Sequence, residues 1–527
     1  MDTPRAATQG ASHPADLGGA RHYDLDAYNA VIRARAADLD ERIPASAIEG
    51  AVPAALRGGA YLLNGPGLVE LGGRLMHPFD GHGFVRALRF DEGGGVRLQG
   101  RFVDTMAYRI EASEGTIRYR GLGTLVADPK RRRGGWLDNL RAPSSKDVAN
   151  TAIVPWNGRL LALWEGGLPH ALDPETLETL GHESFGSTID APYLAHTRVD
   201  HPRGRLVGLS PRPGARATAL TFTEHDGAGK LVCRREASIP EFTIIHDFAI
   251  TERFYVVFAA AMRPDPKAFL RAKFGLGTMI DAVGLDRARA STVYLVPREG
   301  GGPALPISLG RSLFAIHHAS AHDLVGPDGR PIAVVFDSCC LEEFEFGREF
   351  GYRGTDRRLD PGIARGPAGQ LLTRLRLDIE GRRAKAAPLS PYCVDFPRVH
   401  PTRDGYGCRY VYGATTDVPG VSFPFNAILR VDCARAEAES DLAAASTLWA
   451  PGDGRLCGEP VFVPDPEGDD EAAGWVLVMI YDGDADAATT VLCVLDAQRL
   501  DAGPIASVDL DLLLPYGFHG NWAPAKA

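Results

Sequence analysis

The sequence predicts an all-β fold, either a β-propeller or a large barrel, from three observations. Short apolar runs typical of strands recur between turn residues, at intervals of roughly 50 to 80 residues. Helical periodicity is confined to short pieces such as 23–40 and 264–284. The strands do not alternate with helices as in βαβ units, and such even strand spacing favours a propeller or barrel. The runs are GRLLALWEGG from 158, GRLVGLSP from 204, ERFYVVFAAAM from 252, GRPIAVVFDS from 329, GCRYVYGA from 407 and GWVLVMIYD from 474.

Residues 1–45 are expected to be a lead-in that is partly disordered or helical. The start, MDTPRAATQGASHPADLGG, lacks the apolar stretch of a signal peptide. No linker rich in Gly, Ser or Pro divides the rest of the chain, so residues 46–527 are predicted to form a single domain. No stretch approaches the run of about 18 apolar residues that a membrane-spanning helix needs.

The segment 264–284, PDPKAFLRAKFGLGTMIDAVG, allows two interpretations. Its large apolar residues are interspersed with Lys267, Arg271 and Lys273. In a buried lid helix, the apolar residues would belong to the core. In an apolar entrance segment they would lie among lipid headgroups, a position that suits apolar side chains flanked by Lys and Arg.

Composition excludes a general nucleic-acid binder and favours a reducing compartment. The chain has 57 Lys and Arg against 67 Asp and Glu, a formal net charge of -10, so it has no cationic excess to neutralise phosphates. Its eight cysteines are scattered without a CxxC pair. We therefore expect a cytoplasmic protein without a nucleic-acid partner, which could contact a membrane peripherally through 264–284.

The histidines are the strongest candidates for a metal site. In LFAIHHASAHD, 313–323, the neighbours His317 and His318 cannot both face one ion, because successive side chains of a strand point to opposite faces. The innermost strands of a propeller converge on its axis, so histidines at different strand ends could meet there. A lone strand histidine is more often structural than a ligand. The candidates are His196 in YLAHTRVDH, His246 in FTIIHDFAITE, His317 in LFAIHHASAHD and His519 in PYGFHGNW.

Several motifs resemble those of the carotenoid cleavage oxygenases, a family of non-haem iron enzymes. NGPG at 64–67 and HPFDGHGF at 77–84 are similar to early family signatures, and 146–181 resembles the bacterial apocarotenoid oxygenases over nearly its whole length. AHTRVD, IHDFAIT and the C-terminal FHG match further motifs. The resemblance implies a seven-bladed β-propeller with a helical and loop cap over the metal-bearing face. It also implies Fe(2+) held by His196, His246, His317 and His519.

Within the histidine pair, the family pattern FHHxNA makes the first histidine the ligand. The resemblance therefore favours His317 over His318, although Ile316 and Ser320 depart from the pattern. Imidazole is a suitable ligand for iron.

The resemblance also implies three carboxylates behind the ligands, since ligating histidines usually donate their other N–H to a carboxylate. They are Glu165 in LWEGG, Asp395 in CVDFPRVH and Glu459 in GEPVFVP. Most relatives have Glu in place of Asp395, whose side chain is one methylene shorter. Asp395 could therefore reach its histidine only through water or a backbone shift, or could instead bond to a nearby turn.

Three residues resemble those that line the family's substrate and O2 tunnel: Phe79, Thr151 and Trp164. Stilbene-cleaving relatives have a Lys in place of Trp164, which grips a phenolic oxygen. An indole face suits a conjugated polyene but cannot bind phenolate as an ammonium does. Thr151 matches a small residue that restricts access to an open iron position. Packing in the core is the alternative role for Phe79 and Trp164.

The expected function is that of an Fe(II)-dependent dioxygenase that cleaves one double bond of an apolar apocarotenoid with O2. The resemblance implies conversion of β-apocarotenals to retinal. Iron would activate O2 while the tunnel holds the bond, so no catalytic residue is expected beyond the iron centre. The alternatives are a stilbene-cleaving dioxygenase of the same family, a non-oxidative retinoid isomerase and a metal-free propeller that serves as an interaction scaffold.

Overall fold

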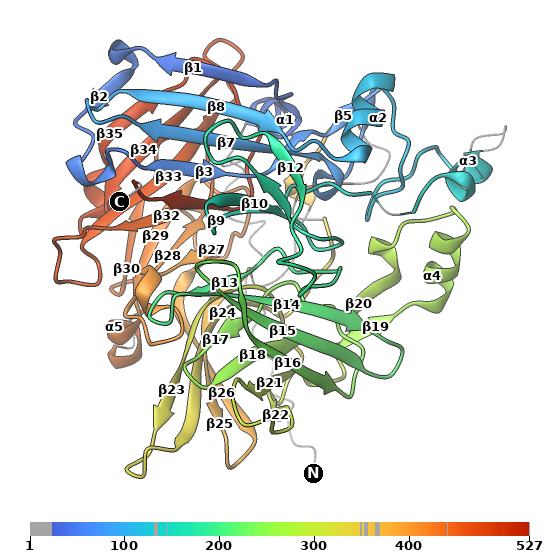
Figure 1. Cartoon of the computed structure of the whole chain (residues 1–527), viewed down its shortest axis with the longest axis vertical. Helices are drawn as coiled ribbons and strands as arrows, with labels where there is room; N and C mark the ends of the chain where they lie inside the picture. Colours follow the sequence, from blue (N-terminus) through green and yellow to red (C-terminus); the bar gives the residue numbers. More distant parts are fainter. Residues whose placement is uncertain are drawn as a thin grey trace, which may run out of the picture.

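The computed structural model describes residues 24–525, apart from 131–134, 145, 348–349, 353–356, 364–368 and 440. Strands dominate its regular structure, so the prediction of an all-β fold is confirmed. The sheets follow one another round a common centre in chain order, from β1 (Leu39–Ile43) at the top of Figure 1 through the green sheets to the red one at the left. This is a propeller-like arrangement.

The first half of the chain forms three antiparallel sheets. The first contains β1, β3 (Ala60–Leu63), β4 (Pro66–Leu68), β7 (His82–Phe90), β8 (Val96–Phe102) and β36 (Gly520–Ala523). The second contains β9 (Ala152–Trp156), β10 (Arg159–Leu163), β11 (His170–Leu172) and β12 (Thr179–His182). The third contains β13 (Arg198–Asp200), β14 (Arg205–Pro213), β15 (Thr218–Asp226) and β16 (Leu231–Ile239).

The second half forms three further sheets of four or more strands. The largest contains β17 (Ala249–Ile250), β18 (Phe254–Ala259), β21 (Thr292–Pro297), β22 (Leu305–Ser308), β23 (Phe314–Val325), β24 (Pro331–Leu341), β25 (Leu371–Asp378) and β26 (Arg383–Cys393). The next contains β27 (Asp395–Arg398), β28 (Tyr410–Thr415), β29 (Ala427–Asp432) and β30 (Ser446–Trp449). The last contains β2 (Ile48–Gly50), β31 (Arg455–Cys457), β32 (Val461–Pro464), β33 (Gly474–Asp482), β34 (Thr489–Asp496) and β35 (Pro504–Asp509).

Hydrogen bonding does not divide the described residues into the seven separate blades that were expected. It gives six sheets of four or more strands, because one sheet has eight. A single parallel pair, Ser308 with Arg383, joins the two four-stranded halves of that sheet. Two small pairs lie outside these sheets: β5 (Glu70–Leu71) with β6 (Arg74–Leu75), and β19 (Met262–Pro264) with β20 (Val283–Leu285).

The order of apolar and polar residues in a strand depends on whether one or both of its faces are covered by the rest of the protein. β33 is buried along most of its length and reads as a continuous apolar run, because it is covered on both faces. β16, the last strand of its sheet, alternates between exposed and half-buried positions, with the period of two that a strand with one solvated face requires.

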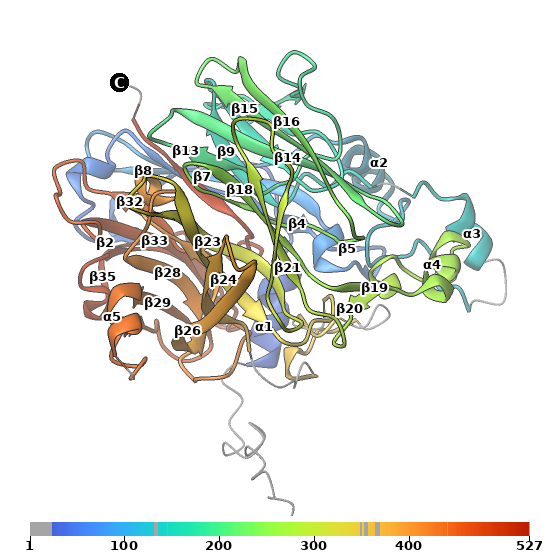
Figure 2. The same ribbon diagram turned by 90° about the horizontal axis from the view of Figure 1, so that it is seen from below.

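Helices are short and few in the described residues. They are α1 (Leu25–Arg33), α2 (Met106–Glu114), α3 (Gly135–Arg141), α4 (Pro266–Lys273) and α5 (Cys433–Ala438), with 3-10 turns at η2 (Ala45–Ala47), η3 (Ala54–Leu56), η4 (Pro78–Asp80), η5 (Ile280–Ala282), η6 (Pro361–Ile363), η7 (Pro401–Arg403) and η8 (Leu500–Ala502). α3 and α4 lie together at one side of the molecule in both views (Figures 1 and 2). The Asn139 side chain of α3 donates to the Gly275 carbonyl after α4, at 3.0 Å. No described helix is both long enough and apolar enough to cross a membrane.

α4 occupies the middle of the segment for which two interpretations were open. Asp265 caps its first turn and Pro266 opens it, which fixes where the helix begins. Phe269 and Leu270 are 51% and 55% exposed, so α4 is not a buried lid helix.

Both ends of the described chain are tied into the sheets. Residues 1–23 of the expected lead-in lie outside the described residues. The rest of the lead-in contributes α1, which buries Tyr28 and Val31, and β1, which pairs with β8. The C-terminal β36 pairs with β3, and the N-terminal β2 pairs with β35. The first and last sheets are therefore each made from both ends of the chain, which closes the ring.

We expect this closure to stabilise the whole molecule. Trp522 of β36 lies directly over Gly59, where an added Cβ would come within 2.2 Å of the indole. Trp522→Ala should therefore lower the free energy of unfolding by about 2 to 3 kcal/mol, somewhat less than truncation of a fully buried aromatic residue. Calorimetric melting measures the change. Trp449→Ala, in the outer strand β30, is the control, and an equal loss in both variants would show that closure contributes nothing extra.

Candidate metal centre

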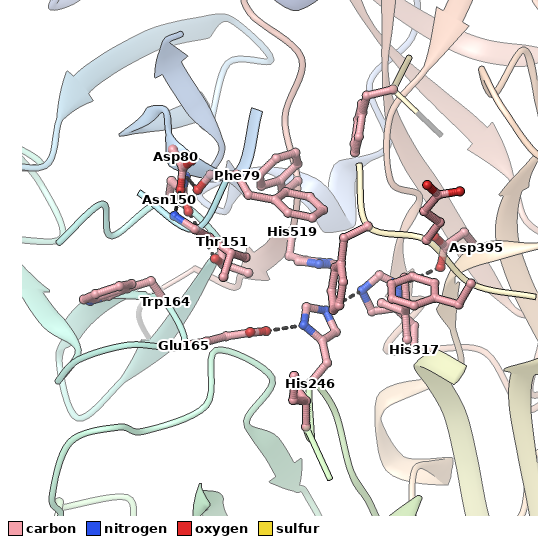
Figure 3. Close-up of a pocket in the computed structure, with 18 of the residues that line it drawn as sticks. Phe79, Asp80, Asn150, Thr151, Trp164, Glu165, His246, His317, Asp395 and His519 are labelled. Atoms are coloured by element: carbon pink, nitrogen blue, oxygen red, sulfur yellow. Dashed lines mark hydrogen bonds and ion pairs between the residues drawn. The ribbon is translucent and has the colours of Figure 1, made fainter. Parts of the chain in front are cut away.

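Four histidines, one within a strand and three just before strands, meet at the centre of the molecule. His196 precedes β13, His246 precedes β17, His317 lies within β23 and His519 immediately precedes β36. The Nε2 atom of His246 is 3.0 Å from Nε2 of His196 and 3.2 Å from Nε2 of His317. The four residues can each offer a nitrogen atom such that all four lie within 4.8 Å of one another. These are the four histidines predicted from the sequence, and the fold brings them together as one quartet. Figure 3 shows three of them, His246, His317 and His519, side by side.

The two neighbouring histidines of β23 point in opposite directions. The His317 ring joins the quartet, whereas His318 hydrogen-bonds to the Ser338 hydroxyl at 2.7 Å and packs against Phe336. Burial lowers the pKa of His318 to about 3, so this histidine is neutral. The arrangement agrees with the choice of His317 over His318.

In three of the four histidines, a carboxylate pairs with Nδ1, the ring nitrogen that faces away from the centre. Glu165 contacts Nδ1 of His246, Asp395 lies 2.5 Å from Nδ1 of His317, and Glu459 lies 2.9 Å from Nδ1 of His519. The pairs formed by His246 and His317 are drawn as dashed lines in Figure 3. No carboxylate among the described residues pairs with His196.

These pairs determine what the centre can bind. A histidine that donates its Nδ1 proton to a carboxylate carries a lone pair on Nε2. Three such lone pairs converge with His196, and without a cation between them they would repel one another. Two imidazole nitrogens bound to one ion at a right angle, each at about 2.1 Å, would lie about 3.0 Å apart, close to the spacing observed here. The residues therefore fit a first-row transition metal such as iron.

The charges around the centre favour neutral ligands and ionised carboxylates. Burial raises the pKa of the Glu459 carboxyl, but Arg398 and His519 outweigh burial and hold this pKa at about 2. Burial also opposes the charge on Asp395, yet His317 keeps the pKa of that carboxyl below its usual value. Burial lowers the pKa of His519, and lowers that of His196 well below its usual value. For His246, Glu165 outweighs burial and raises the pKa, a shift that a bound cation would oppose.

Asp395 reaches its histidine directly despite its short side chain. Its Oδ1 atom also accepts the Phe396 N–H at 2.8 Å, so the carboxylate bonds to the histidine and to the local backbone together. Beside it the backbone is irregular: Phe396 has a φ of 51°, and the pairing of β27 with β28 shifts register between Asp395 and Arg398. A positive φ at a bulky residue is strained, and such strain is common at functional sites.

The centre opens into a cavity of about 620 Å³. His246, His317 and His519 line it, as do all three residues assigned to the tunnel, Phe79, Thr151 and Trp164. His196 faces a separate small cavity of about 80 Å³ on the other side of the quartet. The metal position therefore lies between a large cavity and a small one.

A chain of aromatic contacts runs along the large cavity to the quartet. Phe79 contacts Phe350, which contacts Phe423, with ring centroids 5.6 and 5.2 Å apart. The chain continues through Phe425 to Phe396, whose ring lies 5.5 Å from that of His317. Such a wall suits a long apolar or conjugated ligand.

Sequence reasoning did not identify most of this aromatic wall. The signal was present in the two clusters FEFGREFGY at 344–352 and SFPFN at 422–426, which carry five of the lining aromatic residues. Asn150 was also missed. Its amide donates to the carbonyls of Phe79 and Gly81, and its Oδ1 atom accepts the Thr151 hydroxyl at 3.1 Å. Asn150 thereby fixes two of the three assigned tunnel residues against each other.

Comparisons with known proteins agree with this geometry. The family described as retinal pigment epithelial membrane protein matches residues 34–524. The apocarotenoid-15,15'-oxygenase of Synechocystis is 35% identical over 90% of this chain and 92% of its own. The chloroplastic carotenoid cleavage dioxygenase 7 of Oryza sativa is 31% identical over 94% of this chain and 90% of its own.

Solved structures give the same result. A cobalt-substituted structure of the Synechocystis oxygenase superposes with a TM-score of 0.82 at 31% identity, covering 96% of this chain and 100% of that one. A chimera of that oxygenase with the retinal pigment epithelial protein gives the same values. The chain therefore belongs to the carotenoid cleavage oxygenase family, a family of non-haem iron enzymes.

Proposed function

We propose that this enzyme is an Fe(II)-dependent dioxygenase that cleaves one double bond of an apocarotenoid with O2, converting β-apocarotenals to retinal and a second carbonyl product. One observation carries the proposal: four histidines converge on one point, and the three that carboxylates orient lie at the wall of a cavity lined by aromatic rings. The name of the Synechocystis relative supports this substrate class.

In this proposal His196, His246, His317 and His519 hold the iron through neutral imidazoles. Glu165, Asp395 and Glu459 keep the Nε2 atom of each partner histidine directed at the metal. Bound iron would supply the activation of O2. The protein need not transfer a proton to an unactivated polyene bond, so we assign no catalytic residue beyond the iron centre.

The cavity positions the substrate. The aromatic chain from Phe79 to Phe396 would hold an extended polyene, and Trp164 would offer an indole face where stilbene-cleaving relatives have a lysine. Thr151 lies next to the centre, because its carbonyl accepts the His519 N–H at 3.1 Å. There it would restrict access to an open coordination position.

We propose further that residues 46–527 form one seven-bladed domain. Dividing the eight-stranded sheet at its single parallel pair gives seven sheets, each with at least four strands. Connections between strands, including those that carry Phe350 and Phe423, would form the cap over the metal-bearing face.

The mouth of the cavity is proposed to contact a membrane peripherally. Leu122 and Met279 both line the cavity and are 45% and 42% exposed. Phe269, Leu270 and Phe274 on and after α4 extend this apolar surface, and the basic residues of α4 lie among them. Apolar side chains flanked by cations suit the lipid headgroup region, from which an oily substrate could enter.

The function is tested by a chromatographic product assay of Fe(II)-loaded protein in detergent and air. We expect retinal from a β-apocarotenal and no cleavage of a hydroxystilbene, because Trp164 cannot bind a phenolate as a lysine does. Aromatic aldehydes from the stilbene alone would overturn the substrate assignment. A retinoid isomerised without O2 consumption would overturn the dioxygenase assignment, and the same assay under argon is the control.

Iron retention tests the ligand assignment. His246→Ala removes one imidazole and leaves Glu165 without its partner, so bound iron per chain should fall at least about tenfold while the fold remains intact. Elemental analysis after gel filtration measures the iron, and circular dichroism checks the fold. His322→Ala, on the same strand as His317 but outside the quartet, should keep its iron. An iron-replete, active His246→Ala protein would contradict the assignment.

Membrane contact is tested with phosphatidylcholine vesicles. Phe269→Asp with Leu270→Asp should weaken co-sedimentation at least about tenfold, because burying each of these side chains stabilises binding by about 1.5 to 3 kcal/mol. Ile332→Asp, at a residue 53% exposed on β24, is the matched control. Equal binding by the double variant and the control would refute contact through α4.

A further inference from the structure

A second cluster of metal-binding side chains lies away from the quartet, at the edge of the second sheet. His170 begins β11 and His182 ends β12, and the two residues face each other directly in the antiparallel pair. Their ring centroids are 4.3 Å apart. Asp147, in the segment before β9, lies 2.9 Å from Nε2 of His170 through its Oδ2 atom. Ligand atoms from all three residues lie within 4.8 Å of one another.

The hydrogen bonds of the described residues leave this cluster incompletely satisfied. His170 is only 4% exposed, and its Nδ1 atom has no described hydrogen-bond partner. The Oδ1 atom of Asp147 is likewise buried without a described partner. Buried polar groups are nearly always paired, and an unpaired one costs free energy. A cation bound in the cluster would give the Asp147 carboxylate the partner that its Oδ1 atom lacks among the described residues.

The donor set is the one that zinc prefers. Imidazole is a borderline donor and carboxylate a hard one, and zinc binds both; a tetrahedral zinc site with these three ligands keeps one position for water. Donor atoms of such a site lie about 3.4 Å apart, so the His170 and Asp147 atoms, now 2.9 Å apart, would separate by about half an ångström and His182 would move to meet the ion. His182 can provide this movement, because it is exposed at a strand end, whereas His170 is fixed by burial.

We propose that Asp147, His170 and His182 form a second metal site, which binds a zinc-type divalent ion independently of the iron centre. The ion replaces the proton shared between His170 Nε2 and Asp147 Oδ2, and His182 closes over it from the edge strand β12. The site is open to solvent at the exposed His182 and partly at Asp147, whose side chain is 26% exposed.

The position of Asp147 indicates what the ion would do. Lys146, Val148, Asn150 and Thr151 line the large cavity, so Asp147 lies within the segment that forms one wall of the cavity. Neighbouring Lys146 is held on the cavity side by Glu111, at 2.9 Å. An ion bound to Asp147 would therefore fasten this wall, including Thr151, to the outer hairpin of β11 and β12. Its role is to position the wall and not to take part in cleavage.

Metal counting on the full chain tests the site. Iron-loaded protein is incubated with excess zinc chloride, passed through gel filtration, and analysed for iron and zinc together, so that exchange at the quartet does not alter the total. We expect about two metal ions per chain in the unmodified protein and about one in His182→Ala. Asp147→Asn, which keeps the shape but removes the charge, should lose the second ion as well. His201→Ala is the matched control, an exposed histidine that follows β13.

Each outcome decides the proposal. A total that falls by one ion in both His182→Ala and Asp147→Asn, but not in His201→Ala, supports the site. A total of one ion in the unmodified protein would overturn it, as would a second ion retained by His182→Ala. An equal loss in His201→Ala would show adventitious binding to surface histidines. Zinc should also raise the melting temperature of the unmodified protein and leave that of His182→Ala unchanged.

Discussion

The centre of the structure depends on one electrostatic constraint, which arises because four imidazole rings face the same point. Their Nε2 lone pairs repel one another unless a cation lies between them, and carboxylates on Nδ1 prevent three of the rings from turning away. The propeller-like fold makes this possible, because His196, His246 and His519 lie within three residues of the start of strands from three different sheets. Histidines far apart in sequence thus become neighbours without any one strand carrying two of them.

A buried ion-pair network holds these strands to each other behind the quartet. Arg198, two residues after His196, donates to both oxygens of the Asp247 carboxylate and to the His318 carbonyl. Asp247, which follows His246, accepts the His318 N–H at 2.9 Å. Arg198 and Asp247 therefore connect the three segments that carry His196, His246 and His317. Removing Arg198 would leave the buried Asp247 carboxylate without its cation, which is strongly destabilising. Arg198 also pairs with Asp404, at 3.3 Å.

The residues at the centre also show how a substitution is accommodated. Asp395 is a methylene shorter than the glutamate expected from the family, yet it bonds directly to His317. The backbone next to it is irregular, since Phe396 has a positive φ beside a register shift. The same residue contributes its ring to the aromatic wall, so the conformation that brings the carboxylate to its histidine also places an aromatic ring beside the metal position.

The sequence by itself determined the all-β class, because the spacing of apolar runs and turn residues is a local pattern. Strand geometry excluded only that His317 and His318 face the same point. The four histidines, the choice of His317 and the three carboxylates were predicted from motifs that resemble those of a known family. Only the tertiary structure decided the exposure of α4, the six hydrogen-bonded sheets, the reach of Asp395 and the aromatic wall. Each of these depends on pairings between distant segments, such as Ser308 with Arg383 or Phe350 with Phe423, which no local pattern encodes.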